Sequence, residues 1–122
     1  ARLPLVAQPG EFWQYSVGLD ILGRVIEVAS GQPFDAFLRS RLFEPLGMVD
    51  TGFTLQSKDL KRLAPIYRYK EGGMDPAPAE SVREYLHPNF PAGGGGLVST
   101  LKDYMRFARM LLNSIQVLSL AL

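Results

Sequence analysis

Tyr15 is the first residue in this sequence whose type and position suggest chemistry. It opens the triplet Tyr15-Ser16-Val17, directly before a stretch with helical periodicity. A phenol at the mouth of a helix can carry a proton to or from a ligand. Its ordinary pKa of about 10 means that neighbouring cations must stabilise the phenolate before it acts as a base. The competing interpretation is structural, with the Tyr15 ring packing against Phe12 and Trp13.

A run of four glycines, Gly93, Gly94, Gly95 and Gly96, is the second candidate. Missing side chains suit a flexible hinge, and they equally suit a loop that borders a ligand cleft, where backbone must approach the ligand closely. A phosphate-binding loop is a weaker third interpretation, because such a loop needs a preceding strand and a lysine at a fixed position.

The tetrad Ser99-Thr100-Leu101-Lys102 is a literal Ser-x-x-Lys sequence at a predicted helix start. A serine hydroxyl and a lysine amine one turn apart can form a nucleophile and its base. The same residues are explained by a helix N-cap followed by a surface lysine, and Asp103 makes a near capping box with Thr100. We favour the cap, and we interpret the sole histidine, His87, as a solvated loop residue.

Three helices are predicted to position these residues. The first starts near residue 16, with Ser16 as its N-cap, and ends at Gly31. The second runs from Pro33 to about Pro45, and the third follows Thr100. A short helix over 57–64 and a short strand over 66–69 are weaker expectations, and 70–92 is predicted to be a long loop. The fold class is therefore mainly α with long loops.

Composition bounds the remaining possibilities. The chain has 122 residues, enough for one domain, with 13 basic and 12 acidic side chains in no basic stripe, so nucleic acid is not an expected partner. It has no cysteine, which excludes disulfides and zinc-thiolate sites and leaves the cellular compartment open. We expect no metal and no cofactor. The apolar stretch 115–122 is too short for the roughly 20 residues of a membrane span.

Several motifs together resemble one family of enzymes. The run Pro9 to Ser16 closely resembles the tyrosine motif of serine β-lactamase-like hydrolases, which include class C β-lactamases, D-Ala-D-Ala carboxypeptidases and family VIII esterases. Further segments resemble that family in the same order: Leu22 to Glu27, Ser30 to Gln32, Phe43 to Met48, Asp50 to Phe53 and Gly93 to Thr100. The resemblance extends over roughly residues 5 to 113.

The resemblance implies a mechanism in which a serine from a Ser-x-x-Lys motif attacks an ester or amide carbonyl. In this family the lysine and the motif's tyrosine move the protons, and Tyr15 matches that tyrosine. Gly93 to Gly96 match a loop that borders the substrate cleft. The third position of the tyrosine motif is often asparagine, whereas this chain has Val17, which is closer to the esterase branch and favours small-molecule esters over β-lactams.

The resemblance also implies that residues 1–122 form one unit, the helical domain of a β-lactamase/transpeptidase-like α+β fold. The tail 114–122 is atypical of the family. Neither the upstream Ser-x-x-Lys nor the downstream Lys/His-Thr/Gly-Gly motif is present, so we expect the isolated chain to be inactive and to associate with itself or with a complementary fragment. Two alternatives stay open: a non-catalytic helical interaction module, and a small autonomous esterase using Ser99, Lys102 and Tyr15.

Overall fold

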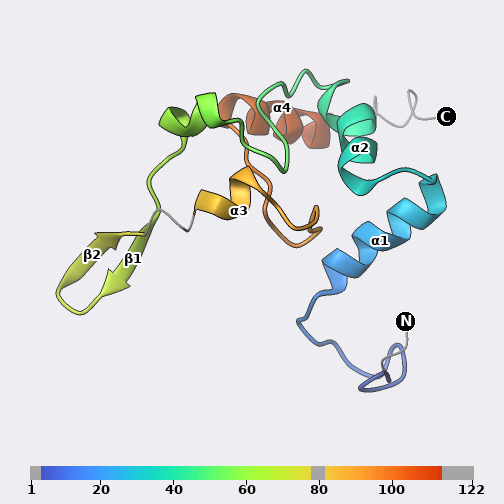
Figure 1. The fold of residues 1–122 in the computed structure, drawn as a ribbon. Coiled ribbons are helices and arrows are strands. Elements are labelled where there is room, and N and C mark those ends of the chain that lie inside the picture. The colour runs from blue at the N-terminus through green and yellow to red at the C-terminus, as the bar shows by residue number, and fades with distance from the viewer. Residues whose placement is uncertain (1–3, 78–81, 114–122) are drawn as a thin grey trace.

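The computed structural model describes residues 4–77 and 82–113 of the chain, and its elements are mostly helical (Figure 1). In chain order they are α1 Gly18–Ser30, α2 Phe34–Leu38 with a π-helical continuation Arg39–Phe43, a 3-10 helix Ser57–Arg62, strands β1 Tyr67–Lys70 and β2 Gly73–Pro76, α3 Arg83–Leu86 and α4 Leu101–Leu112. Helices thus accompany a small two-stranded sheet, and long irregular segments connect them.

Helix α1 begins one residue later than Ser16 would place it. Val17 is the N-cap, and its carbonyl accepts hydrogen bonds from the amides of Asp20 and Ile21 at 3.0 and 3.1 Å. The prediction of Ser16 as the cap was wrong. The predicted end is confirmed, because Gly31 adopts a left-handed φ of 68° and its N–H donates to the Glu27 carbonyl at 2.9 Å.

A carboxylate links α1 to α2. Glu27 accepts a hydrogen bond from the Phe34 amide at 3.1 Å and pairs with Arg24 at 2.7 Å. The hydrogen bond from Arg24 is the main cause that lowers the pKa of Glu27, and the bond from the Phe34 amide adds to it. The first turn of α2 leaves amides without helical partners, so Glu27 supplies a cap that neither Gly31 nor Pro33 can give.

The buried core consists of four apolar side chains from α2 and the segment that follows it: Phe34, Phe43, Met48 and Phe53. The Phe34 ring lies over Gly23 of α1, where a β-carbon would be 3.4 Å from the ring. Its centroid is 5.8 Å from that of Phe53. Gly23 therefore packs directly under the Phe34 ring, and this contact holds α1 against α2.

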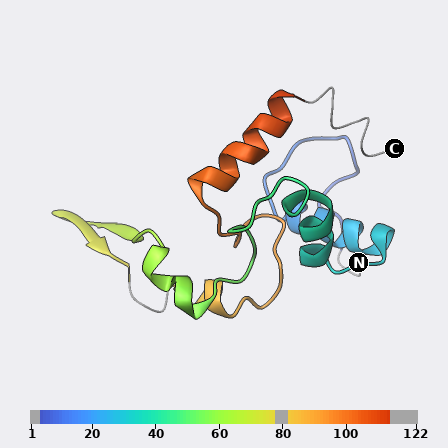
Figure 2. The ribbon, with the colours of Figure 1, turned by 90° about the horizontal axis from the view of Figure 1, so that it is seen from above.

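The hairpin formed by β1 and β2 projects away from the helices, as Figures 1 and 2 both show. Its antiparallel register pairs Tyr67 with Pro76 and Lys70 with Gly73, which confirms a strand close to the one predicted at 66–69. The prediction of a plain loop over 70–92 was wrong, because β2 and α3 lie there. All eight strand residues are exposed, so no alternating apolar pattern marks the second strand.

Much of the apolar surface of α1 and α4 is exposed in this chain. Ile21, Leu22, Val25 and Val28 of α1 and Leu101, Tyr104, Met105, Leu111 and Leu112 of α4 are among the exposed large hydrophobic residues. Met105 of α4 is half exposed. Within the described segments, none of the helices has the length and apolar content to cross a membrane.

Candidate functional site

Tyr15, the predicted catalytic tyrosine, is exposed to solvent. The Tyr15 side chain is 86% exposed, and the nearby Trp13 ring has its centroid 6.4 Å away at a tilt of 55°. Because Trp13 is itself 82% exposed, this pair does not bury the phenol. Residue 15 lies three positions before Gly18, the first residue of α1, so the side chain stands at the N-terminal end of that helix.

Tyr15 and the glycine run line the same groove. The groove has a volume of about 1030 Å³, and its walls come from residues 13–21, 88–90, 92 and 94–96. The structure thus brings together two candidates that are about 80 positions apart in the sequence, Tyr15 and Gly94 to Gly96. Gly93 is not among the lining residues, so the predicted four-glycine border is a three-glycine border.

The glycine run is fixed to the first turn of α1. The Gly94 amide donates to the Asp20 carboxylate, Oδ1, at 2.8 Å. One residue earlier, Gly93 lies so close to Leu19 that a β-carbon on Gly93 would be 2.0 Å from the Leu19 carbonyl oxygen. The sequence analysis did not single out Asp20. Its only signal was an acidic residue in a first helical turn, which helix electrostatics alone would explain.

The Ser-x-x-Lys tetrad that begins at Ser99 has structural roles. The Ser99 hydroxyl is 2.8 Å from the Thr51 hydroxyl, and Thr100 caps α4 by accepting from the Asp103 amide at 3.3 Å. Ser99 lines a different cavity, of about 270 Å³, and the Lys102 side chain is exposed. The structure therefore does not place Ser99 in the groove that Tyr15 borders. His87 is exposed, as predicted.

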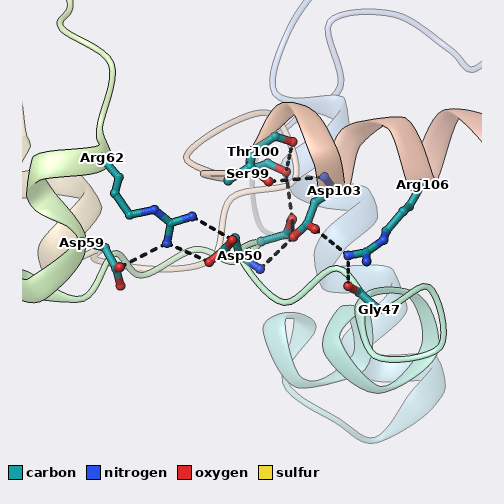
Figure 3. A network of polar contacts seen from close by, with 9 residues as sticks. Gly47, Asp50, Asp59, Arg62, Ser99, Thr100, Asp103 and Arg106 are labelled. Carbon is teal, nitrogen blue, oxygen red and sulfur yellow. Dashed lines mark hydrogen bonds and ion pairs between the residues drawn. The ribbon is translucent and has the colours of Figure 1, made fainter.

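A buried carboxylate organises a network of polar contacts at the start of α4 (Figure 3). Asp103 is 1% exposed, and its Oδ2 accepts hydrogen bonds from the Asp50 amide at 2.7 Å and the Thr51 hydroxyl at 3.0 Å. Arg106 donates to Oδ1 of Asp103 at 3.0 Å and also to the Gly47 carbonyl. These bonds attach α4 to the segment that follows α2, next to the backbone bridge between Gly52 and Val98.

Arg62 extends this network toward the 3-10 helix. Its guanidinium binds the Asp50 carboxylate through two bonds, of 2.9 and 2.8 Å, and pairs with Asp59 at 3.2 Å (Figure 3). Hydrogen bonding to Arg62 holds the pKa of Asp50 below its ordinary value, and the Asp50 carboxylate raises the pKa of Arg62. We interpret the network as structural, because every one of these side chains has a partner within the chain.

Comparison with known protein families identifies the family to which the chain belongs. The family model described as Beta-lactamase matches residues 1–121 of the chain. The chain belongs to the β-lactamase family.

Relatives within this family include enzymes named for ester chemistry. Esterase EstB of Burkholderia gladioli is 36% identical over 122 residues, which cover 87% of this chain and 31% of EstB. Protein Rv1367c of Mycobacterium tuberculosis is 38% identical over 112 residues, 92% of this chain and 28% of that protein. This β-lactamase-family chain therefore spans less than a third of the length of either relative.

The fold agrees with that of solved family members. A variant of simvastatin synthase, LovD, from Aspergillus terreus has a TM-score of 0.81 and 28% sequence identity, covering 95% of this chain and 29% of LovD. The described part of the chain thus has the arrangement found in the β-lactamase/transpeptidase-like fold. The family assignment made from the spaced motifs is confirmed.

Proposed function

We propose that this chain is the helical, cleft-bordering unit of a serine hydrolase that cleaves esters or amides through an acyl-enzyme, with Tyr15 as a catalytic proton carrier. The observation that supports this most directly is the groove shared by Tyr15 and Gly94 to Gly96. An exposed phenol in the same groove as three glycines leaves space for a substrate carbonyl and for a nucleophile supplied by another part of the protein.

In the proposed reaction a serine hydroxyl attacks the substrate carbonyl carbon while its proton passes to a base. The tetrahedral intermediate then collapses, the leaving alcohol or amine takes up a proton, and the acyl group stays on the serine. Water later attacks the acyl-serine and releases the acid. Tyr15 is the residue of this chain that we assign to the proton transfers, and a nearby lysine ammonium would stabilise its phenolate.

We assign esters as the preferred substrates. The described groove walls are rich in apolar side chains, among them Trp13, Leu19 and Phe90. The one acidic wall residue, Asp20, is bonded to the Gly94 amide. Such a surface suits a neutral acyl or alcohol group better than an anionic one. Val17 in the tyrosine motif and the name of the relative esterase EstB support the same assignment.

The proposal includes inactivity of the chain by itself. It can be tested by incubating the chain with a fluorophosphonate probe and with a labelled penicillin, followed by mass spectrometry of the intact protein. We expect no adduct from either reagent, because the proposed nucleophile is outside these residues. An adduct on Ser99 would instead support the autonomous esterase and would contradict the proposal.

A chimera tests the positive part of the proposal. The segment of EstB that aligns with this chain would be replaced by this chain's residues, and ester hydrolysis would be measured with p-nitrophenyl acetate. We expect an active chimera in which Tyr15→Phe lowers kcat by about 100- to 10,000-fold, the range typical of a lost proton carrier. Tyr69→Phe is the matched control, because Tyr69 is an exposed tyrosine on the hairpin. An unchanged kcat in Tyr15→Phe would refute the assignment.

A further inference from the structure

Two adjacent contacts join the glycine run to α1. In the first, the Asp20 carboxylate accepts a hydrogen bond from the Gly94 amide at 2.8 Å. A hydrogen bond with an ionised acceptor is stronger than one between neutral groups. In the second, the Gly93 backbone lies against the Leu19 carbonyl, a position that only glycine can occupy. The two contacts involve consecutive residues on both segments: Leu19 lies against Gly93, and Asp20 binds Gly94.

The remaining two glycines are free of such contacts. A β-carbon added at Gly95 or at Gly96 would meet no atom within 4 Å, and Gly96 has a φ of 81°, which favours glycine. Both residues line the groove. The run therefore has two parts: Gly93 and Gly94 are held by α1, whereas Gly95 and Gly96 face open space.

We propose that Asp20 is a positioning residue for the active site. This inference rests on the function proposed above. Tyr15 stands just before α1, and Asp20 lies in the first turn of the same helix. By binding the Gly94 amide, Asp20 sets the distance between the phenol and the glycine wall before substrate arrives. Catalysis is sensitive to displacements of about 1 Å in such walls, so loss of this bond slows the reaction although Asp20 does not touch the substrate.

A purely helical role for Asp20 is the competing explanation, because an acidic side chain in a first turn interacts favourably with the helix dipole. Asp35 provides the matched control. It also lies in a first helical turn, that of α2, and it lines the other cavity. A helix-dipole role predicts the same effect from Asp20→Ala and Asp35→Ala, whereas the positioning role predicts an effect at the groove from Asp20→Ala only.

Hydrogen exchange of the Gly94 amide tests the contact in the chain itself. We expect exchange to be about 10-fold faster in Asp20→Ala than in the unaltered chain, the factor that corresponds to one lost hydrogen bond to a charged group. Asp20→Asn keeps an acceptor oxygen and should restore most of the protection, and Asp35→Ala should leave it unchanged. Equal exchange in the unaltered chain and in Asp20→Ala would overturn the inference.

Kinetics of the EstB chimera test the consequence. Asp20→Ala should lower kcat by about 10- to 100-fold, Asp20→Asn should recover most of the loss, and Asp35→Ala should have no effect. If Tyr15→Phe abolishes activity while Asp20→Ala does not change kcat, the positioning role is wrong and the proposed function stands. An inactive chimera, or one in which neither variant changes kcat, counts against the proposed function. Hydrogen exchange then tests the contact between Asp20 and Gly94 independently of activity.

Discussion

The Gly93 backbone lies against the Leu19 carbonyl of α1, where a β-carbon on Gly93 would be only 2.0 Å from the oxygen. Real contacts between carbon and oxygen are more than 1 Å longer than this. Gly93 therefore serves close packing between two segments and does not provide a hinge. The next residue, Gly94, is bonded to Asp20, so the glycine run begins with two residues that the fold holds in place.

Gly93→Ala should destabilise the chain. The added methyl group cannot be accommodated without moving the run away from α1, and overpacking of this kind costs about 1–3 kcal/mol. Urea unfolding followed by circular dichroism would measure the change. Gly95→Ala is the matched control, because a β-carbon there meets open space, and it should leave the free energy of unfolding nearly unchanged. Equal stabilities of the two variants would contradict the packing explanation.

Gly95→Val should alter substrate selection in the EstB chimera. The valine side chain would project from the glycine wall into the groove that Tyr15 also lines. We expect kcat/KM for a long-chain acyl ester to fall by about 10-fold or more, the scale of an apolar pocket that loses space for a few methylenes, with little change for an acetyl ester. A uniform loss for both esters would instead indicate a general disturbance of the site.

Asp103→Ala should destabilise the chain by about 2–4 kcal/mol. The substitution leaves three partly buried donors without their acceptor: the Asp50 amide, the Thr51 hydroxyl and one N–H group of Arg106. Thermal or urea unfolding measures the loss. Asp75→Ala removes a carboxylate that pairs with Lys70 on the exposed hairpin, and this control should cost less than about 1 kcal/mol.

The pairing of Asp50 with Arg62 should make stability depend on acid pH. The pKa of Asp50 is lower in the folded chain than its ordinary value of about 3.9, so the unfolded chain binds the proton more readily. The contribution of the pair is therefore complete above about pH 5 and is lost as the pH falls through the folded pKa.

Urea unfolding midpoints between pH 6 and pH 2.5 would show this dependence. In Arg62→Gln the decline below pH 5 should be shallower, because the pKa of Asp50 then lies closer to its unfolded value. Lys61→Gln removes the same charge from the neighbouring position of the 3-10 helix and is the control. A profile that is identical in the unaltered chain and in Arg62→Gln would refute the linkage.

The exposed apolar residues of α1 and α4 should make the isolated chain associate with itself. Exposed apolar patches of this kind are usually covered by another surface. Sedimentation velocity should show a sedimentation coefficient that rises with concentration, and Val28→Asp on α1 should weaken that rise. Val49→Asp changes a valine that is more exposed than Val28 and lies outside the helices, and it is the control. A chain that stays monomeric at high concentration would contradict the expectation.

Features that depend on neighbours in the sequence were predictable from the residues. The span of α1 and its end at Gly31, the Thr100 cap of α4 and the β-lactamase family all follow from local patterns and from the order of short motifs. Caps and helical stripes act within a few residues, so the sequence contains the whole of their cause. The hairpin strand Gly73–Pro76 was not predicted, because its residues have no buried face.

Only the tertiary structure decided which distant residues meet. The sequence identifies Asp103 only as the third helical residue of a capping box. In the structure its carboxylate binds Asp50 and Thr51, about fifty positions away. Asp20 reads as an ordinary first-turn acid, yet it holds Gly94 beside the groove. The sequence by itself determined the family, the main helices and the candidate tyrosine. The packing of α1 against the glycine run determined which glycines face the groove, because such contacts depend on how the chain folds back on itself.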